Sequence, residues 1–586
     1  MNLRRPTWTW GALALAFAVA GLAIVAPLAG MLLASFRVRE VVLTTGQALR
    51  AAGPVVHDEA GFRFQMPSED DPDADLQPVI LPSTRVAGVH EAWSLAHYRD
   101  VFGSSRTIGR LRNSLVLATG SGLLALLLGL PVAVLLARFR LPGRRLVFSL
   151  LAAPLLLPPF FAAMGVAGAV SPLLLSLGLP PPGVQLGNAM VCFAGLLFPI
   201  PTLLVARALA AVPEGLVEAA RLFGGPGVAR RHVVWPSLRP AVLASFALVF
   251  AVALCDFAVP DLLGVFLPHG AVPVHVFATE IFLQWNKYGN VGRAVATGAP
   301  FVLAVLAVLL LAAALLRRCP AGTLGGSTRA RAQVRLGARG MPVALLVLAI
   351  PFTLGLVLPI GSVMSWGFSA ARIPQTVRET VGLMDDSLRW IRLGLLAALL
   401  TTAVAVVLAR AALRGGRAVR GLVGLVGALP LAVPGMALMV GTLVLWVSIP
   451  TPPGSLWKGV LVLVGRFLPY GLLAAGLALR EVDPRLEEAG RLLGASPMTR
   501  ALRIWGPLSR RGIASAFLLV LVFAWRELDA LVLIEPGILP VRIYDKVHFG
   551  RTGPVADLSI AYLAVLLVPA ALVALLSGSR RAANPN

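Results

Sequence analysis

The hydrophobic residues of this chain fall into long runs that short polar segments separate. We place twelve such runs near residues 11–35, 113–137, 146–170, 188–208, 240–263, 294–316, 341–366, 391–409, 421–447, 459–479, 512–533 and 558–578. About 20 apolar residues cross a bilayer as a helix, and a helix satisfies its own backbone hydrogen bonds in lipid. The pattern therefore predicts an all-α polytopic membrane protein with about 12 transmembrane helices.

Composition agrees with this prediction. The chain is 58% hydrophobic and only 13% charged, and its mean hydropathy of +0.84 excludes an ordinary soluble protein. The first run follows Arg4 and Arg5 and is too long for a signal-peptide core, so we expect it to be a retained helix.

The net charge of +24 has a strongly uneven distribution. If the N-terminus is inside, almost the whole positive excess lies on segments that face the cytoplasm, as the positive-inside rule requires. Basic cytoplasmic loops explain the charge better than a nucleic-acid partner. We therefore expect a multi-pass inner-membrane protein with both termini in the cytoplasm and lipid, not nucleic acid, around it.

The apolar runs form two similar sets of six. Prolines recur at matching places in the two sets, with Pro154 and Pro158 matched by Pro430 and Pro434, and Pro199 by Pro469. Any single proline could reflect bent packing alone, but matching prolines favour two copies of one bundle. Because six is an even number, the two copies have the same orientation, as parallel repeats. The predicted division is a first half at 1–316, a cytoplasmic linker at 317–340 and a second half at 341–586.

One polar loop also occurs twice, as EAARLFG from Glu218 and as EAGRLLG from Glu488. The second copy predicts a short helix over 485–500 with Asp483 as its N-cap, and with Gly494 as a left-handed or close-approach residue that ends it. The first copy repeats this logic with Gly224. An ordinary connecting loop is the alternative, but duplication at matching positions favours duplicated contacts with a partner.

The two loops resemble the EAA loop of the membrane subunits of binding-protein-dependent ABC importers. In the second copy the glycine, the apolar residue and the proline, Gly494, Ile504 and Pro507, follow Glu488 at the spacing of that family. The second copy departs from the family pattern at its third residue, which is glycine, and the first copy is one residue short before Pro236. Twelve spans with two such loops resemble the fused two-half permeases of ferric-iron and thiamine importers, which have a type I ABC importer fold.

The resemblance implies that both loops are ATPase-coupling elements. The positions carried over are Glu218, Ala219, Ala220 and Gly224 in the first loop and Glu488, Ala489, Gly490 and Gly494 in the second. It also implies two copies of a cytoplasmic ABC ATPase and an extracytoplasmic solute-binding protein as partners. The chain has no Gly-x-x-x-x-Gly-Lys-Ser/Thr sequence to cradle phosphates. We therefore expect no catalytic residue and no bound cofactor here, with ATP used by the partner subunit.

Charged residues near the ends of the fifth and eleventh runs are candidates for the translocation path. Asp256 follows the first loop at almost the same interval as Glu527 follows the second, and the two carboxylates are equivalent once the missing residue is allowed for. The remaining candidates are Asp261, Arg526 and Asp529. A charge inside a span costs roughly 2.5–3.5 kcal/mol and usually marks a pathway or an ion pair. The alternative is that these groups hold helix ends near the outer interface.

The polar stretch 37–112 is the largest region outside the predicted spans. We interpret it as a solvated loop, with its acidic segment 69–75 as a weaker candidate for docking an outer partner. A short amphipathic helix is predicted from Ser94 to Asp100. The three cysteines and the outer residues His269, His275, Glu280, Tyr544 and His548 have no metal-ligand spacing, so we predict no metal site.

The sequence therefore predicts the permease subunit of an ATP-driven solute importer, with ferric iron as the favoured solute. Importers of thiamine, phosphonate or polyamine have the same arrangement of spans and stay open as alternatives. A secondary transporter is an alternative from another class, because it also has twelve spans in two halves, but it would need no repeated loop. A membrane-embedded enzyme would need acidic or histidine residues clustered at one interface, and it ranks last.

Overall fold

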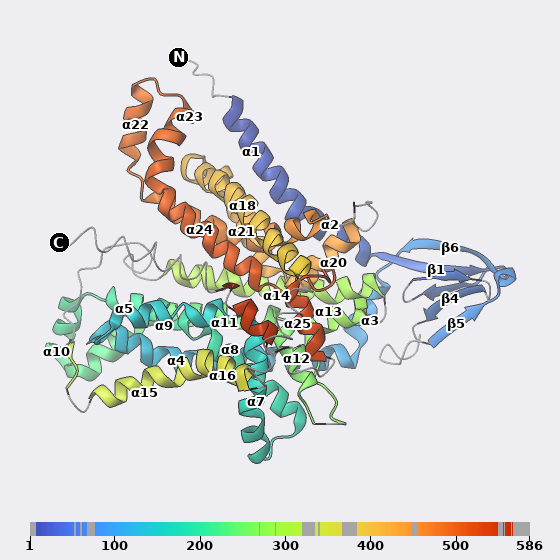
Figure 1. The fold of residues 1–586 in the computed structure, drawn as a ribbon, viewed down its shortest axis with the longest axis horizontal. Coiled ribbons are helices and arrows are strands. Elements are labelled where there is room, and N and C mark those ends of the chain that lie inside the picture. The colour runs from blue at the N-terminus through green and yellow to red at the C-terminus, as the bar shows by residue number, and fades with distance from the viewer. Residues whose placement is uncertain are drawn as a thin grey trace.

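The computed structural model describes residues 7–51, 54–58, 61–66, 77–268, 270–286, 289–318, 334–337, 340–365, 384–446, 452, 455–548, 555, 557–563 and 565–566. Figure 1 shows an elongated bundle of helices with a group of β-strands projecting from one end. The helices α10 and α22, which carry the two repeated loops, lie at the opposite end of the bundle. The two copies of the loop therefore share one end of the molecule.

In the described part, nine helices are long and apolar enough to cross a membrane, and two bent helix pairs bring the total to eleven. The nine are Gly11–Ser35, Ser105–Arg138, Pro159–Ser176, Glu214–Cys255, Val291–Ala312, Gly340–Ser365, Met384–Arg414, Trp457–Arg480 and Pro497–Arg526. The pairs are Pro181–Leu197 with Pro199–Ala210 and Arg417–Ala432 with Gly435–Trp446. These account for eleven of the twelve predicted spans and confirm the helical membrane class. Most of the twelfth, 558–578, lies outside the described residues.

The first half begins with α1 (Thr7–Ala20), a π-helical turn η1 (Gly21–Val25) and α2 (Ala26–Ser35). Its other helices are α3 (Ala96–Gly103), α4 (Ser105–Arg138), α5 (Arg144–Leu150), α6 (Ala153–Leu156), α7 (Pro159–Ser176), α8 (Pro181–Leu197), α9 (Pro199–Ala210), α10 (Glu214–Val228), η3 (Ala229–Val234), α11 (Trp235–Cys255), α12 (Ala258–Val265), α13 (Phe277–Asn286) and α14 (Val291–Arg317). The linker 317–340 is described only in part, and its strand β8 (Val334–Arg335) pairs in parallel with β7 (Phe139–Arg140) after α4.

The second half repeats this order, including the π-helical turns. Its elements are α15 (Gly340–Phe352), η4 (Thr353–Val357), α16 (Leu358–Ser365), α18 (Met384–Arg414), α19 (Arg417–Ala432), α20 (Gly435–Trp446), α21 (Trp457–Arg480), α22 (Pro484–Leu492), α23 (Pro497–Arg500), η6 (Ala501–Trp505), α24 (Gly506–Arg526) and α25 (Leu539–His548). The turn η4 interrupts the leading span as η1 does in the first half. Likewise, η6 follows the second loop as η3 follows the first.

The leading span of each half packs against the other half. Helices α1 and α2 contact α18 and α20, whereas α15 and α16 contact α4 and α7 (Figure 1). Two glycines at equivalent positions of the repeat permit the same close approach. A Cβ added at Gly195 of α8 would meet the backbone of η4, and one added at Gly465 of α21 would meet the backbone of η1. Each leading span therefore packs on the opposite half, and at Gly195 and Gly465 the two backbones are too close for a larger residue.

The prolines of the third and ninth predicted spans lie at matching breaks, whereas Pro199 separates α8 from α9 and its counterpart Pro469 lies inside the continuous helix α21. The third predicted span, 146–170, is divided into α5, α6 and α7, and the ninth bends by 105° between α19 and α20. At the first break Leu157 N donates to Pro154 O at 3.2 Å, and at the second Val433 N donates to Pro430 O at 3.4 Å. Proline cannot donate a backbone hydrogen bond and clashes with the preceding turn. The prediction of two copies of one bundle, drawn from the prolines, agrees with this geometry.

The polar stretch after α2 is not the solvated loop that we expected. Six strands form two three-stranded antiparallel sheets with orders β2-β1-β6 and β3-β4-β5. The strands are β1 (Arg37–Leu43), β2 (Ala48–Ala51), β3 (Val56–Asp58), β4 (Gly61–Met66), β5 (Gln77–Leu81) and β6 (Val86–Trp93). Val41, Ala51 and Phe64 form their small buried core. Alternating apolar residues in short strands can bury one face between sheets, and that weak signal was hidden by the surrounding charges and turn formers. The acidic segment 69–75 lies outside the described residues.

The predicted amphipathic helix is present as α3 and attaches this β unit to the bundle. The Ser94 hydroxyl accepts a hydrogen bond from Ala96 N at 3.1 Å near the start of the helix. Arg50 of β2 donates to both carboxylate oxygens of Asp100, and His97 Nε2 lies 3.1 Å from Arg37 O. The β unit therefore has specific polar contacts with α3 in addition to its chain connections.

Candidate functional site

The second repeated loop forms two short helices. The Asp483 carboxylate accepts a hydrogen bond from Arg485 N at 2.9 Å, and Pro484 occupies the first helical position of α22. Gly494 has φ +77° and separates α22 from α23. The predicted cap and the predicted left-handed glycine are both confirmed. The single helix predicted over 485–500 is interrupted by that glycine.

The first loop fulfils the expectation for its glycine by close approach, because the left-handed turn falls on the next residue. Its left-handed residue is Gly225, with φ +75°, and not Gly224. A Cβ at Gly224 would lie 2.5 Å from Val228 Cγ2, so this glycine relieves crowding and leaves the turn to its neighbour. The second loop has alanine, Ala495, at the position equivalent to Gly225. The left-handed turn can therefore fall one position later in the first loop only.

The glycine that departs from the family pattern, Gly490, has a packing explanation. It is buried in the second loop helix, and an added Cβ would lie 2.5 Å from Ile504 Cδ1. Ala220 occupies the equivalent position in the first loop and packs in an apolar cluster with Val233 and Val234. Val234 and Ile504 precede the tryptophan that follows each loop, so the small residue and the apolar partner recur together.

Each loop carries a pair of large apolar side chains that are almost fully exposed. Leu222 is 87% exposed and Phe223 93% in the first loop, while Leu492 is 89% and Leu493 87% in the second. Glu218 and Glu488 are exposed beside them. Each pair is exposed apolar surface of the kind that marks a protein contact, and the two pairs match at one end of the molecule.

The opposite face of each loop helix is buried, but its chemistry differs between the halves. Val217 is 2% exposed and packs with Val212 and Ala229. The equivalent residue of the second half is Glu487, whose carboxylate pairs with Arg410, Arg414 and Arg500. Our sequence reasoning missed Glu487. The signal was available, because an acidic residue replaces an inward-facing valine at the same place in a repeat.

The equivalence of Asp256 and Glu527 is visible in the backbone. Asp256 ends α11 and Glu527 ends α24. Asp256 Oδ1 accepts a hydrogen bond from Val259 N at 2.9 Å, and Glu527 Oε1 accepts one from Ala530 N at 3.0 Å. Each carboxylate thus caps the segment that follows its own helix, in the same i to i+3 pattern.

The remaining charges of this cluster join the two halves and satisfy broken helices. Asp529 Oδ2 of the second half accepts a hydrogen bond from Phe257 N of the first at 3.2 Å. Arg526 donates to Leu155 O beside the proline break of the first half. Arg466 of α21 donates to Val433 O at 2.8 Å at the other break and lies 3.9 Å from Glu527. A backbone carbonyl freed by proline inside a membrane needs such a partner.

The fifth candidate, Asp261, belongs to a different contact between the halves. Tyr544 of α25 donates its hydroxyl hydrogen bond to Asp261 Oδ2, and His548 Nε2 lies 3.3 Å from the same oxygen. Asp261 and His548 also line a cavity of about 250 Å³ together with Gln185, His275 and Thr279. The Gln185 amide is hydrogen-bonded to the backbone of Pro260 and Val274. The structure therefore separates Asp261 from the other four candidates.

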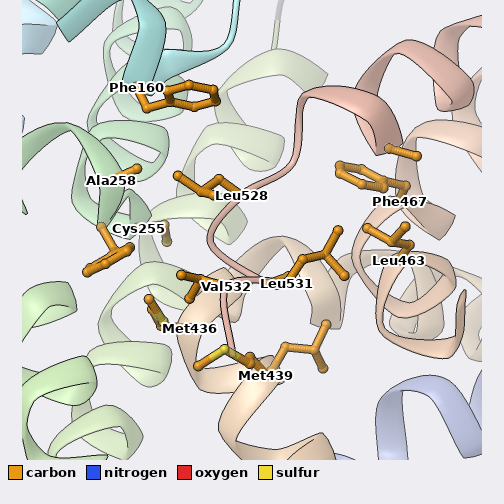
Figure 2. Close-up of a cluster of buried hydrophobic side chains, with 14 of the residues drawn as sticks. Phe160, Cys255, Ala258, Met436, Met439, Leu463, Phe467, Leu528, Leu531 and Val532 are labelled. Carbon is orange, nitrogen blue, oxygen red and sulfur yellow. The ribbon is translucent and has the colours of Figure 1, made fainter. Parts of the chain in front are cut away.

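An apolar contact surrounds the charged cluster. Figure 2 shows Leu528, Leu531 and Val532 on the segment after α24, with Cys255 and Ala258 of the first half to one side. Met436, Met439, Leu463 and Phe467 of the second half complete the group, and all the labelled residues are buried (Figure 2). The apolar side chains of this contact are packed against one another and are buried in the conformation that the structure shows.

Among the described residues, no group of three His, Cys, Asp or Glu side chains is placed to hold a metal ion. His275 lies at the cavity of Asp261, and His269 is outside the described residues. Glu280 pairs with Arg110 at 2.6 Å and accepts a hydrogen bond from Gln284 at 2.6 Å. This carboxylate is an internal structural partner.

The fold and these sites define a membrane permease made of two homologous halves. Comparison with known proteins gives its family. The model of the binding-protein-dependent transport system inner membrane component matches twice, at residues 126–319 and 402–582, and the chain belongs to that family. It is a multi-pass inner-membrane protein and a fused two-half permease of the ABC importer type.

Several curated permeases are similar to this chain. The thiamine transport system permease protein ThiP of Brucella abortus is 26% identical over 492 residues, which are 80% of this chain and 86% of the relative. A probable molybdenum ABC transporter permease of Haloferax volcanii is 30% identical over 33% of this chain and 70% of its own length. A putative 2-aminoethylphosphonate transport system permease, PhnV of Salmonella paratyphi A, is 32% identical over 24% of this chain and 54% of its own length.

Proposed function

We propose that this chain is the translocating subunit of an ATP-driven importer. Two copies of a cytoplasmic ABC ATPase would bind its repeated loops, and an extracytoplasmic solute-binding protein would deliver the solute. In this scheme both termini and the linker 317–340 face the cytoplasm. The observation that carries the proposal is the pair of matching loops with exposed apolar tips at one end of the bundle (Figure 1).

The shape and exposure of these loops support the proposed coupling role. Each is a short helix held on its buried face, so a partner that grips the exposed face can move the helix as a unit. Leu222 and Phe223, with Leu492 and Leu493, would be the apolar anchors in grooves of the two ATPase copies. Glu218 and Glu488 lie exposed beside them and would add a charged contact.

For the translocation path we propose the contact between the halves at Asp256, Glu527 and Asp529, with Arg526 beside them. These groups lie at equivalent helix ends and are held by hydrogen bonds within and across the halves. When the halves separate, the apolar contact and the cross-half bond from Phe257 N to Asp529 would open together. The freed carboxylates would then face the passing solute. Asp261, in its separate contact with Tyr544 and His548, would line the outer part of the path.

For the solute we propose a positively charged molecule, and thiamine before ferric iron. The lengthwise similarity to a thiamine permease supports an organic cation. Three carboxylates cluster at the proposed path, with Arg466 and Arg526 beside them, and these carboxylates would be the contacts for a cationic solute. Ferric iron, our expectation from the sequence, would use the same carboxylates and is the second candidate.

Reconstitution tests the function directly. The chain should drive ATP-dependent uptake in liposomes when a partner ABC ATPase and solute-binding protein are added, and should drive none alone. Replacing Leu492 and Leu493 by serine should weaken ATPase association, while replacing Leu473 and Leu477, which are exposed on the apolar span α21, should not. Uptake by the chain alone, driven by a proton or sodium gradient, would overturn the proposal. Competition between thiamine and ferric complexes then ranks the solutes.

A further inference from the structure

The buried side chain of the loop helix has changed character between the halves. Val217 directly precedes Glu218, and Glu487 directly precedes Glu488, so the two buried positions are equivalent in the repeat. Val217 makes apolar contacts with Val212 and Ala229, which allow small sliding movements because dispersion contacts have no preferred direction. Glu487 occupies the same position with a charge.

Three arginines meet the Glu487 carboxylate. Arg410 and Arg414, one turn apart at the inner end of α18, both donate to Oε2, and Arg500 Nη1 lies 3.8 Å from Oε1. Burial acts to raise the pKa of this carboxyl, but hydrogen bonding by Arg410 and the charges of all three arginines outweigh it and hold the pKa below its usual range. The group is therefore ionised at neutral pH, and its contacts are charge-assisted hydrogen bonds with fixed directions.

Arg410 also contacts the other end of the second loop. The Arg410 guanidinium lies over the ring of Trp505, 5.1 Å from its centroid, in the turn that leads into α24. One side chain of α18 thus contacts both the loop helix α22 and the segment η6 that follows it. Arg500, between these two elements, completes the set.

Helix α18 continues without interruption from these arginines to the charged cluster at the contact between the halves. Near its outer end Trp390 Nε1 donates to Trp525 O at 3.1 Å, and Trp525 Nε1 donates to Ile391 O at 3.3 Å. Trp525 directly precedes Arg526 and Glu527. A single helix of 31 residues therefore connects the second loop to the proposed path through polar contacts at both ends.

We propose that Glu487 is a positioning residue that ties the second loop helix to α18, so that movement of this loop reaches the path through α18. The first loop has only the apolar contact of Val217 at the same place, and it follows its ATPase more loosely. This inference rests on the proposed function and deepens it. It makes the two coupling loops mechanically unequal, with the second as the stiffer connection.

The test uses the full complex of this chain with its ATPase and solute-binding protein in liposomes. Glu487→Gln removes the charge at nearly constant shape and leaves three arginines without their partner. We expect solute transported per ATP hydrolysed to fall about threefold or more, which is within the range of single-residue effects on coupling. The KM for ATP and subunit association should stay as in the wild type. Glu487→Asp should recover part of the loss. Arg420→Gln is the control: it removes a charge from an exposed side chain at the same end of the bundle, and it should leave the transport per ATP unchanged.

Two further variants keep the inference open to refutation. If Glu487→Gln fails to assemble, Arg414→Gln removes one of the two guanidinium groups and leaves Arg410 in place. A partial loss of coupling in this assembled variant supports the inference, and unchanged coupling overturns it. Val217→Ala in the first loop should affect coupling less than Glu487→Gln. An equal or larger effect would contradict the proposed inequality. If the wild-type complex shows no ATP-driven uptake at all, the proposed function fails instead.

Discussion

Substitutions at Asp256 can show whether this carboxylate takes part in transport or only stabilises the fold. The side chain caps Val259 N through one oxygen and is buried between the halves. Asp256→Asn retains an oxygen that can accept this hydrogen bond and removes only the charge. Asp256→Ala removes both. Comparing the two variants therefore separates capping from charge at one position.

The expected magnitudes follow from these contacts. Asparagine and aspartate are nearly equal as helix caps, so Asp256→Asn should change stability little, while Asp256→Ala should lose about 1 kcal/mol (range roughly 0.5–2). A hydrogen bond or contact to a charged group contributes about 1.5–3 kcal/mol. If a cationic solute uses this carboxylate during passage, losing it should lower the apparent affinity of the transport step by about 10- to 100-fold.

Uptake and stability must be measured on the same preparations. We expect Asp256→Asn to melt as the wild type does in detergent but to transport a cationic solute much more slowly in liposomes. Glu527→Gln, at the equivalent cap, should behave likewise. Wild-type uptake by Asp256→Asn together with lowered stability of Asp256→Ala would refute the path assignment. The carboxylate would then serve only to end α11 and start the next segment.

Two other changes test the loop and the outer unit. Gly494→Ala places a side chain at φ +77°, which should cost about 1–2 kcal/mol in the second loop and weaken ATPase association, whereas Gly476→Ala inside α21, with open space around it, should not. Burial, and then the Arg50 charge, lower the pKa of His97 to about 4. The unfolded histidine, with a pKa near 6.5, binds a proton first as pH falls, so the attachment of the β unit should lose up to about 1.4 kcal/mol per pH unit between about 6.5 and 4. Tryptophan fluorescence should report that transition, His97→Gln should flatten it, and His57→Gln should leave it unchanged.

Features encoded by local chemistry were predictable from the sequence. The Asp483 cap and the left-handed Gly494 depend on residues within one turn, and both are present. The equivalence of Asp256 and Glu527 came from counting along a repeat, and the structure gives them the same hydrogen bond. The spans were predictable because lipid requires long apolar helices.

Features that depend on distant partners were not predictable in the same way. The strands of the β unit are short, and only their pairing across the sheets buries Val41 and Phe64. The arginines that satisfy the proline breaks come from remote segments, as when Arg526 reaches Leu155 O. Even within the first loop, two adjacent glycines could each take the left-handed turn, and the choice of Gly225 depends on how its neighbour packs in the folded loop.

The two halves have diverged in a selective way. The exposed apolar pairs of the loops are nearly identical in character, Leu with Phe in one and Leu with Leu in the other, as expected if both face copies of the same ATPase. The buried face has no such constraint, because it meets only its own half, and there Val217 and Glu487 differ completely. A fused chain can keep two matching contact surfaces for its partner while it changes the connection behind each one. Two separate copies of one gene product could not do this, since both halves would carry the same buried residue.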